Sequence, residues 1–129
     1  MSLKSKGING ERELVHMFWA KNWACLRIAG SGSNKYPSPD LLVSNRLRRL
    51  AIECKITKDN KKYFNKESID SLLKFADIFG AEAWIAVKFK GNEWYFASLE
   101  DLAATNKGFV LNINTAKQKG FLFDELVNK

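Results

Sequence analysis

Hydrophobic and polar residues alternate along residues 50–56 as they do in a half-buried β-strand. Every second residue from Leu50 to Ile56 is apolar, whereas Glu53 and Lys55 point together to the opposite face. Residues 40–44 predict a short strand before it, and a turn at Asn45-Arg46 joins the two. This hairpin can bring the carboxylate of Asp40 close to that of Glu53, so two acids and a lysine would converge.

The rest of the pattern predicts two main helices and three more strands. Residues 8–22 place Ile8, Val15, Phe18 and Trp19 on one helical face. The second helix is expected to bury four residues and to end at the C-cap glycine, Gly80. Those four residues are Ile69, Leu72, Leu73 and Ala76.

The predicted elements imply a single α/β domain over residues 1–129, with a flexible segment at 1–6 and a central mixed five-stranded sheet flanked by helices. Residues 30–39 and 57–65 are predicted loops. The elements in order are a helix (8–22), three strands (23–29, 40–44, 48–56), a helix (66–79), two strands (83–89, 93–97), a short helix capped by Ser98 that includes Leu99 and Leu102, and a helical segment over about 115–127.

One acid is out of place in this pattern. On a helical wheel, Glu11 falls between Phe18 and Val15 on the apolar stripe of the first helix. A carboxylate near a helix N-terminus can simply be favoured by the helix dipole. The alternative is an acid that faces inward toward a functional site.

The charge of the chain narrows its possible partners. Lysine and arginine number 21 against 14 acidic residues, which gives a net charge of +7. This balance suits a polyanion, nucleic acid before an anionic membrane. No apolar run reaches the roughly 18 residues that a membrane span needs, and the N-terminus lacks a signal-peptide core, so we expect a cytoplasmic protein.

Cysteine and histidine usage excludes several kinds of site. Cys25 and Cys54 lie in apolar stretches, as reduced and buried thiols do. His16 is the only histidine, and no zinc-ligand spacing occurs. Zinc binding and catalytic triads that use histidine are therefore not expected.

Asp40 and Glu53 instead suit a hard divalent cation. Mg²⁺ prefers oxygen ligands and keeps several waters, so one or two carboxylates can hold it against a phosphate. The backbone carbonyl of Cys54 could add a ligand, and Glu11 could act through a water. Lys55 would position the attacking water or stabilise the charge of a phosphate, which together are the requirements of phosphodiester hydrolysis.

Other polar residues could contact phosphates. Ser31 or Ser33 could donate to a phosphate oxygen. Five arginines are candidates for DNA binding. The alternative for three of them is a merely charged hairpin, and the alternative for Glu-x-Lys alone is a solvated face. The arginines are Arg12, Arg27, Arg46, Arg48 and Arg49.

Five motifs, in order, resemble the archaeal-type Holliday junction resolvases, within the restriction-endonuclease-like nuclease superfamily. The match covers about residues 4–98, most of the chain, and the residues after Ser98 match weakly. The motifs are Gly7-x-x-x-Glu11-Arg12-Glu13-Leu14-Val15, Arg27-x-x-Gly30-Ser31-Gly32, Pro39-Asp40, Ile52-Glu53-Cys54-Lys55 and Phe75-Ala76-x-x-Phe79-Gly80-Ala81-Glu82-Ala83.

The resemblance implies a restriction-endonuclease-like fold and a homodimer that nicks opposing strands of four-way DNA junctions with Mg²⁺, for which Mn²⁺ could substitute. No other small-molecule cofactor and no membrane partner are implied. Glu11, Asp40, Glu53 and Lys55 would be catalytic, with Asp40 and Glu53 on the metal. Ser31 would be an accessory catalytic residue, Arg12 and Arg27 would assist phosphate binding, and Phe75 and Phe79 would form the dimer interface.

Two alternatives stay open at the level of sequence. One is a broader branched-DNA or repair nuclease of the same fold, cellular or viral. The other is a DNA-binding module without catalysis. For the resolvase, the expected location is the cytoplasm beside the nucleoid, or the host-cell cytoplasm for a viral protein.

Overall fold

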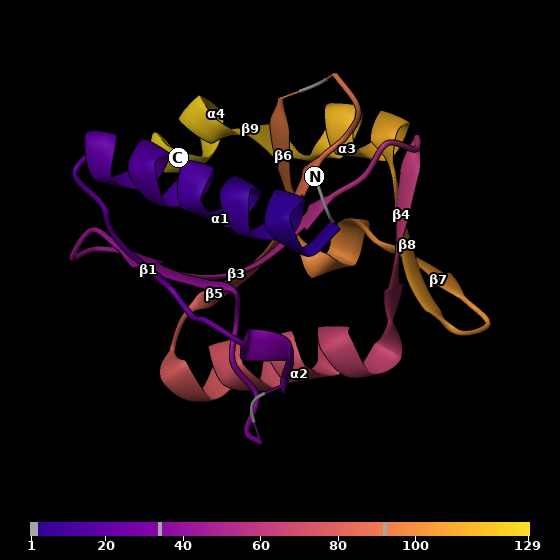
Figure 1. Cartoon of the computed structure of the whole chain (residues 1–129), viewed down its shortest axis with the longest axis horizontal. Coiled ribbons are helices and arrows are strands. Elements are labelled where there is room, and N and C mark those ends of the chain that lie inside the picture. The colour runs from indigo at the N-terminus through magenta and orange to yellow at the C-terminus, as the bar shows by residue number, and fades with distance from the viewer. Residues whose placement is uncertain (1–2, 34, 92) are drawn as a thin grey trace.

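The computed structural model describes residues 3–33, 35–91 and 93–129 and contains two β-sheets with helices on both sides of the larger one (Figure 1). The larger sheet has the order β1-β2-β3-β5-β6-β9, in which only the central β3–β5 pair is parallel. Its strands are β1 (Ala24–Arg27), β2 (Leu41–Ser44), β3 (Arg49–Ile56), β5 (Glu82–Lys88), β6 (Trp94–Ala97) and β9 (Phe121–Leu122).

Two long helices cover opposite faces of this sheet (Figure 1). α1 (Leu3–Ala20) includes residues 3–6, which the sequence placed before the helix, while residues 1 and 2 lie outside the described part of the chain. α2 (Lys66–Phe79) has the predicted bounds. Asn65 caps its N-terminus by accepting the backbone N–H of Ser68, and Gly80 ends it in the left-handed conformation with φ of 83°.

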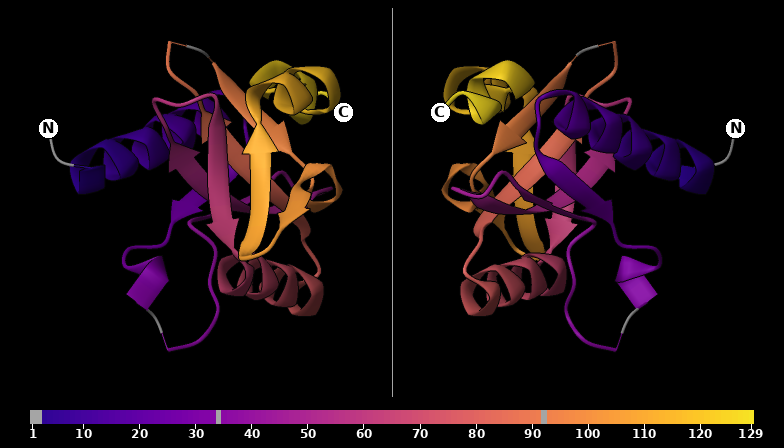
Figure 2. Two further views of the ribbon diagram at one scale, coloured as in Figure 1. Left: turned by 90° about the vertical axis from the view of Figure 1, so that its right-hand side faces the viewer. Right: turned by 90° about the vertical axis from the view of Figure 1, so that its left-hand side faces the viewer.

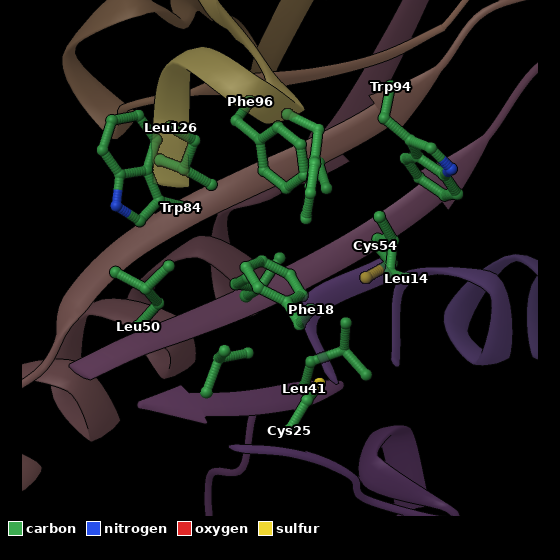
Figure 3. Close-up of a cluster of buried hydrophobic side chains, with 14 of the residues drawn as sticks. Leu14, Phe18, Cys25, Leu41, Leu50, Cys54, Trp84, Trp94, Phe96 and Leu126 are labelled. Carbon is green, nitrogen blue, oxygen red and sulfur yellow. The ribbon is translucent and has the colours of Figure 1, made fainter. Parts of the chain in front are cut away.

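The first core cluster lies between α1 and the sheet. Leu14 and Phe18 of α1 are fully buried there, and Phe18 packs edge-on against Phe123 with ring centroids 5.0 Å apart. Figure 3 shows this cluster with Cys25 and Cys54 inside it, both as free thiols, which confirms their predicted buried state.

Two helical residues predicted to be buried are exposed. Trp19 is 55% exposed because its indole lies at the edge of the core, where its Nε1–H donates to the Cys25 carbonyl at 3.1 Å. Leu73 is 49% exposed because it falls outside the inward arc of Ile69, Leu72 and Ala76.

The second core cluster lies between the sheet and α2 and includes residues of a smaller sheet that the sequence did not predict. This sheet has the order β4-β8-β7 and supplies Phe64 and Leu111 to the core. The predicted loop 57–65 was therefore wrong in its second half. The strands are β4 (Lys61–Asn65), β7 (Ala103–Thr105) and β8 (Gly108–Asn112).

The end of the chain also differs from the prediction of one helix over 115–127. Gly120 ends α3 (Ile113–Lys119), and β9 then adds a sixth strand to the expected five before α4 (Phe123–Val127). The segment after Ser98 is a short 3₁₀ turn, η2 (Leu99–Asp101), and the Ser98 side chain makes no capping bond.

The turns match the sequence more closely. Arg46 has φ of 85° in the predicted turn between β2 and β3, and Gly91 has φ of 67° between β5 and β6, whereas Asn92 lies outside the described residues. No helix in the described ranges is both long and apolar enough to cross a bilayer.

Candidate active site

Asp40 lies at the start of β2 and is held by backbone groups on two sides. Its N–H donates to the Ile52 carbonyl at 3.0 Å, and its carbonyl accepts the N–H of Ile28 at 2.9 Å. The side chain is 7% exposed, and Oδ2 accepts the Cys54 N–H at 2.9 Å while Oδ1 accepts the Ser31 hydroxyl. The carboxylate is therefore fixed before any ligand binds.

Glu53 meets Asp40 in the way that the hairpin predicts. The Glu53 carboxyl is within hydrogen-bonding reach of Asp40, and its side chain is 15% exposed. Burial, and then the negative charge of Asp40, raise the pKa of Glu53 to about 7. Two carboxylates that are kept close against their own repulsion form a site that a cation would stabilise.

Lys55 completes the group on the same face of β3, with Nζ 3.3 Å from Glu53 Oε2. Burial lowers the pKa of Lys55, but the charges of Glu53 and Asp40 outweigh that effect, so the net shift is upward. Lys55 is therefore an ammonium at neutral pH, which suits charge stabilisation and excludes it as a general base.

Glu11 comes from α1, which packs on the opposite face of the sheet from α2. Its Oε1 accepts Arg27 Nε–H at 2.9 Å. Burial and the charge of Asp40 raise the pKa of Glu11, while Arg27 and Lys55 oppose this rise. Glu11 thus lies within electrostatic range of Asp40 and Lys55, and its nearest cation is Arg27.

Two neighbouring cavities expose these side chains. The first, of about 500 Å³, is lined by Asp40, Glu53 and Lys55. The second, of about 720 Å³, is lined by Glu11 and Arg27, and the two cavities share Ser31 and Lys55. The predicted catalytic residues are therefore gathered around two adjacent cavities.

Two oxygen donors, and not a larger cluster, define the candidate metal position. Within residues 3–33, 35–91 and 93–129, no group of three or more His, Cys, Asp or Glu side chains is arranged to hold a metal ion. The carboxylates of Asp40 and Glu53 fit Mg²⁺, which keeps several of its own waters.

The predicted arginine set divides in two. Arg12 and Arg46 are exposed, Arg27 lines the second cavity, and Arg49 donates to the Gly80 carbonyl at 3.0 Å. Arg48, by contrast, is bonded within the fold.

Arg48 is bound within the fold. Its Nε and Nη2 donate to both carboxylate oxygens of Glu82 at 2.9 and 3.0 Å, and Nη1 donates to the Leu126 carbonyl at 2.7 Å. Its guanidinium also lies over the Trp23 ring, 5.5 Å from the centroid. Arg48 therefore stabilises the fold, and its role in DNA binding stays a prediction.

The first cavity has a second wall that the sequence did not predict. It consists of the first turns of α2 and the loop before Asp40, with Lys35, Glu67, Ser68 and Ser71 among its residues. Asn65 signals the start of α2 in the sequence, because asparagine is a favoured N-cap residue, and it lines this cavity. Placing that helix start at the cavity would have required recognition of β4. Of the two predicted phosphate-binding serines, Ser31 faces this cavity.

Comparisons with known proteins agree with this geometry. The family model described as archaeal Holliday junction resolvase (hjc) matches residues 2–129. The chain belongs to this family.

Relatives and a solved structure place the chain within the same group. A crossover junction endodeoxyribonuclease Hjc from Archaeoglobus fulgidus is 37% identical over 110 residues, covering 85% of this chain and 81% of the relative. Hjc from Sulfolobus acidocaldarius is 35% identical over 130 residues, covering 98% and 90%. The structure of A. fulgidus Hjc, a Holliday junction resolvase, has a TM-score of 0.87 at 32% identity and covers 93% and 97%. The predicted restriction-endonuclease-like α/β fold is confirmed.

The raised pKa of Glu53 predicts an unusual dependence of stability on pH for the metal-free protein. In the unfolded chain Glu53 ionises near its ordinary pKa of 4.5, but in the fold it keeps its proton up to about pH 7. The free energy of unfolding that this proton contributes is fully present below pH 4.5 and is lost as pH rises toward 7. Thermal melting in EDTA should therefore show a lower Tm at pH 7.5 than at pH 5, and Glu53→Gln should reduce that difference.

Glu100→Gln removes an equivalent charge at an exposed position and is the control. Its Tm should change with pH as that of the wild type does. An unchanged pH dependence in Glu53→Gln would show that Glu53 ionises normally in the fold.

Proposed function

We propose that this protein resolves Holliday junctions as a structure-selective, divalent-metal-dependent endodeoxyribonuclease that nicks opposing strands. The observation that carries the proposal is the meeting of Asp40 and Glu53 beside Lys55 in an open cavity. The relatives in its family are named crossover junction endodeoxyribonucleases, and the net charge of +7 suits a DNA substrate. A location beside the nucleoid in the cytoplasm stays a prediction that follows from that substrate.

Mg²⁺ is the proposed metal, held by the carboxylates of Asp40 and Glu53. These oxygens are hard donors, and the proximity of the two acids, which contributes to the raised pKa of Glu53, supports a cation site. When bound, Mg²⁺ would activate water and stabilise negative charge on the phosphate. Mn²⁺ as a substitute, the Cys54 carbonyl as a further ligand, and Glu11 acting through water stay predictions.

The chain's own residues would divide the remaining work. Lys55 would donate to a phosphate oxygen or orient the attacking water, because it is a fixed ammonium beside Glu53. Ser31 holds Asp40 in place through its hydroxyl. Glu11 would keep Arg27 oriented along the second cavity, where the guanidinium can contact DNA.

We also propose a homodimer formed through α2. Phe75 and Phe79 stack with ring centroids 5.3 Å apart, and Ile78 and Phe79 are 76% and 46% exposed. These aromatics and Ile78 line an apolar surface cavity of about 290 Å³ together with Tyr36 and Pro37. An exposed apolar surface of this kind suits a two-fold contact, and two equivalent sites suit two equivalent phosphates.

Phe79→Ala is expected to shift the protein toward the monomer because it removes an exposed apolar side chain at the centre of the proposed contact. Sedimentation velocity over a range of protein concentrations measures the shift. Tyr63→Ala removes an exposed aromatic side chain from β4 and should leave the mass unchanged. A Phe79→Ala protein with the same mass as the wild type would assign this aromatic pair to packing within one chain.

Two alternatives have distinct outcomes. A broader branched-DNA nuclease would cleave a flap or a splayed duplex as fast as a four-way junction, whereas the proposed resolvase would prefer the junction. A DNA-binding module without catalysis would cut none of these substrates and would bind the junction whether or not Asp40 is intact.

A further inference from the structure

The second cavity extends away from the catalytic carboxylates, between α1 and the turn that joins β3 to β4. It is lined by Lys6, Ile8, Lys58 and Lys62, in addition to the Glu11–Arg27 pair. In the left panel of Figure 2, α1 and the loop between β1 and β2 extend to the same side of the sheet. Of its four lysines, Lys55 is shared with the first cavity, whereas Lys6, Lys58 and Lys62 lie outside the proposed catalytic group.

The two cavities differ in charge. The first contains Asp40, Glu53 and also Glu67, against Lys35 and Lys55. In the second, the acid Glu11 is already paired with Arg27, and Asp59 is the other acid. A polyanion whose phosphate lies at Lys55 is therefore attracted toward the second cavity and repelled from the far side of the first.

Lys58 and Lys62 are free to bind an anion. Neither forms an ion pair with a carboxylate in the part of the chain that the structure describes, and both residues line the cavity. Lys58 is exposed and Lys62 is half-buried.

The turn that carries these lysines is held at three points. The Thr57 N–H donates to the Lys88 carbonyl at 3.0 Å, and the Asp59 N–H donates to Thr57 Oγ1 at 3.1 Å. The Ile113 N–H donates to the Asn60 carbonyl at 2.8 Å. A backbone that is fixed before binding lowers the entropy cost of placing the two ammonium groups on a ligand.

We propose that the second cavity is a binding subsite for the DNA backbone beside the scissile phosphate, with Lys58 and Lys62 as its phosphate ligands. The inference rests on the proposed function, because it assumes that the cut phosphate lies at Asp40, Glu53 and Lys55. Contacts of this kind position the duplex without reading its sequence. The subsite would thus determine the direction in which the cleaved strand leaves the metal position.

The test compares two double variants of equal charge. Lys58→Gln/Lys62→Gln removes the proposed phosphate ligands, while Lys117→Gln/Lys119→Gln removes two exposed lysines of α3 that line neither cavity. Binding of an immobile four-way junction is measured by fluorescence anisotropy in EDTA over a range of NaCl concentrations, and single-turnover cleavage is measured at saturating protein.

The subsite variant is expected to weaken junction binding about tenfold and to reduce the slope of log Kd against log salt by about 1 to 2, since each lost phosphate contact removes about 0.9. The α3 variant should change both values by less than about twofold. At saturation the subsite variant should still cleave. Equal losses in the two variants, or no loss in the subsite variant, would overturn the subsite.

Neutral methylphosphonates that replace single phosphates on either side of the cut provide a second readout. A methylphosphonate on one side of the cut should weaken junction binding by the wild type but should not weaken binding by the subsite variant. Additive losses on both sides would also overturn the proposal. A wild type that binds but never cleaves a junction would instead overturn the proposed function, so the two failures are distinguishable.

Discussion

Asp40→Asn is expected to abolish junction cleavage while the protein still binds the junction. The change removes one of two metal-binding carboxylates, and loss of several kcal/mol of charge stabilisation corresponds to a rate decrease of about 10³-fold or more. The fold should persist, because the asparagine oxygen can still accept the Cys54 N–H that Asp40 accepts at 2.9 Å. Junction affinity in EDTA should be equal or slightly tighter, since one negative charge facing the phosphates is gone.

The comparison needs rate, affinity and stability on the same preparation. Single-turnover cleavage in Mg²⁺, anisotropy in EDTA and thermal melting supply them, with Glu100→Gln as a control for removal of an exposed acid. Cleavage by Asp40→Asn within tenfold of the wild type would remove Asp40 from the catalytic group.

Lys55→Met should decrease the cleavage rate by about 10² to 10³-fold, because a fixed ammonium that stabilises developing phosphate charge contributes about 3 to 4 kcal/mol in comparable sites. Methionine keeps much of the length and volume of the side chain but removes the ion pair with Glu53 at 3.3 Å. Without that ammonium the pKa of Glu53 should rise further, because Lys55 lowers it in the wild type.

A pH profile separates these two effects of Lys55→Met. The loss that results from protonated Glu53 should shrink as pH rises from 7 to 9, whereas the loss of phosphate stabilisation should persist at pH 9. Lys117→Met on α3 is the matched control and should cleave at the wild-type rate. A Lys55→Met enzyme with full activity at pH 9 would limit Lys55 to keeping Glu53 ionised.

The arrangement of the proposed catalytic group was predictable because it depends on local periodicity. The alternation of β3 places Glu53 and Lys55 on one face, and a single hairpin is enough to bring Asp40 opposite them. The wheel position of Glu11 left open an acid favoured by the helix dipole or one that faces inward, and its side chain is only 16% exposed. Each of these inferences needed only the geometry of one element or of two adjacent ones.

What could not be predicted depends on pairing between distant segments. Lys61 and Lys62 hide the alternation of β4, whose stability comes from β8 nearly fifty residues later, with Phe64 opposite Phe109. Because β4 was not recognised, the α2 N-terminus could not be placed at the first cavity.

The role of Arg48 likewise depends on groups distant in the chain. Its guanidinium is held by Glu82 and the Leu126 carbonyl, and nothing near it in the sequence indicates either partner. The charged hairpin predicted to bind DNA therefore carries one arginine that stabilises the fold through partners distant in the sequence.

Junction resolution by this protein is best tested by strand-resolved cleavage of an immobile four-way junction. Each of the four strands is labelled in turn, and single-turnover reactions run with Mg²⁺ and with EDTA beside a plain duplex of one arm's sequence. The proposed resolvase should make symmetric nicks in two opposing strands of the junction, with no cleavage in EDTA and little cleavage of the duplex. Cleavage that persists in EDTA, or that proceeds equally on the duplex, would contradict it.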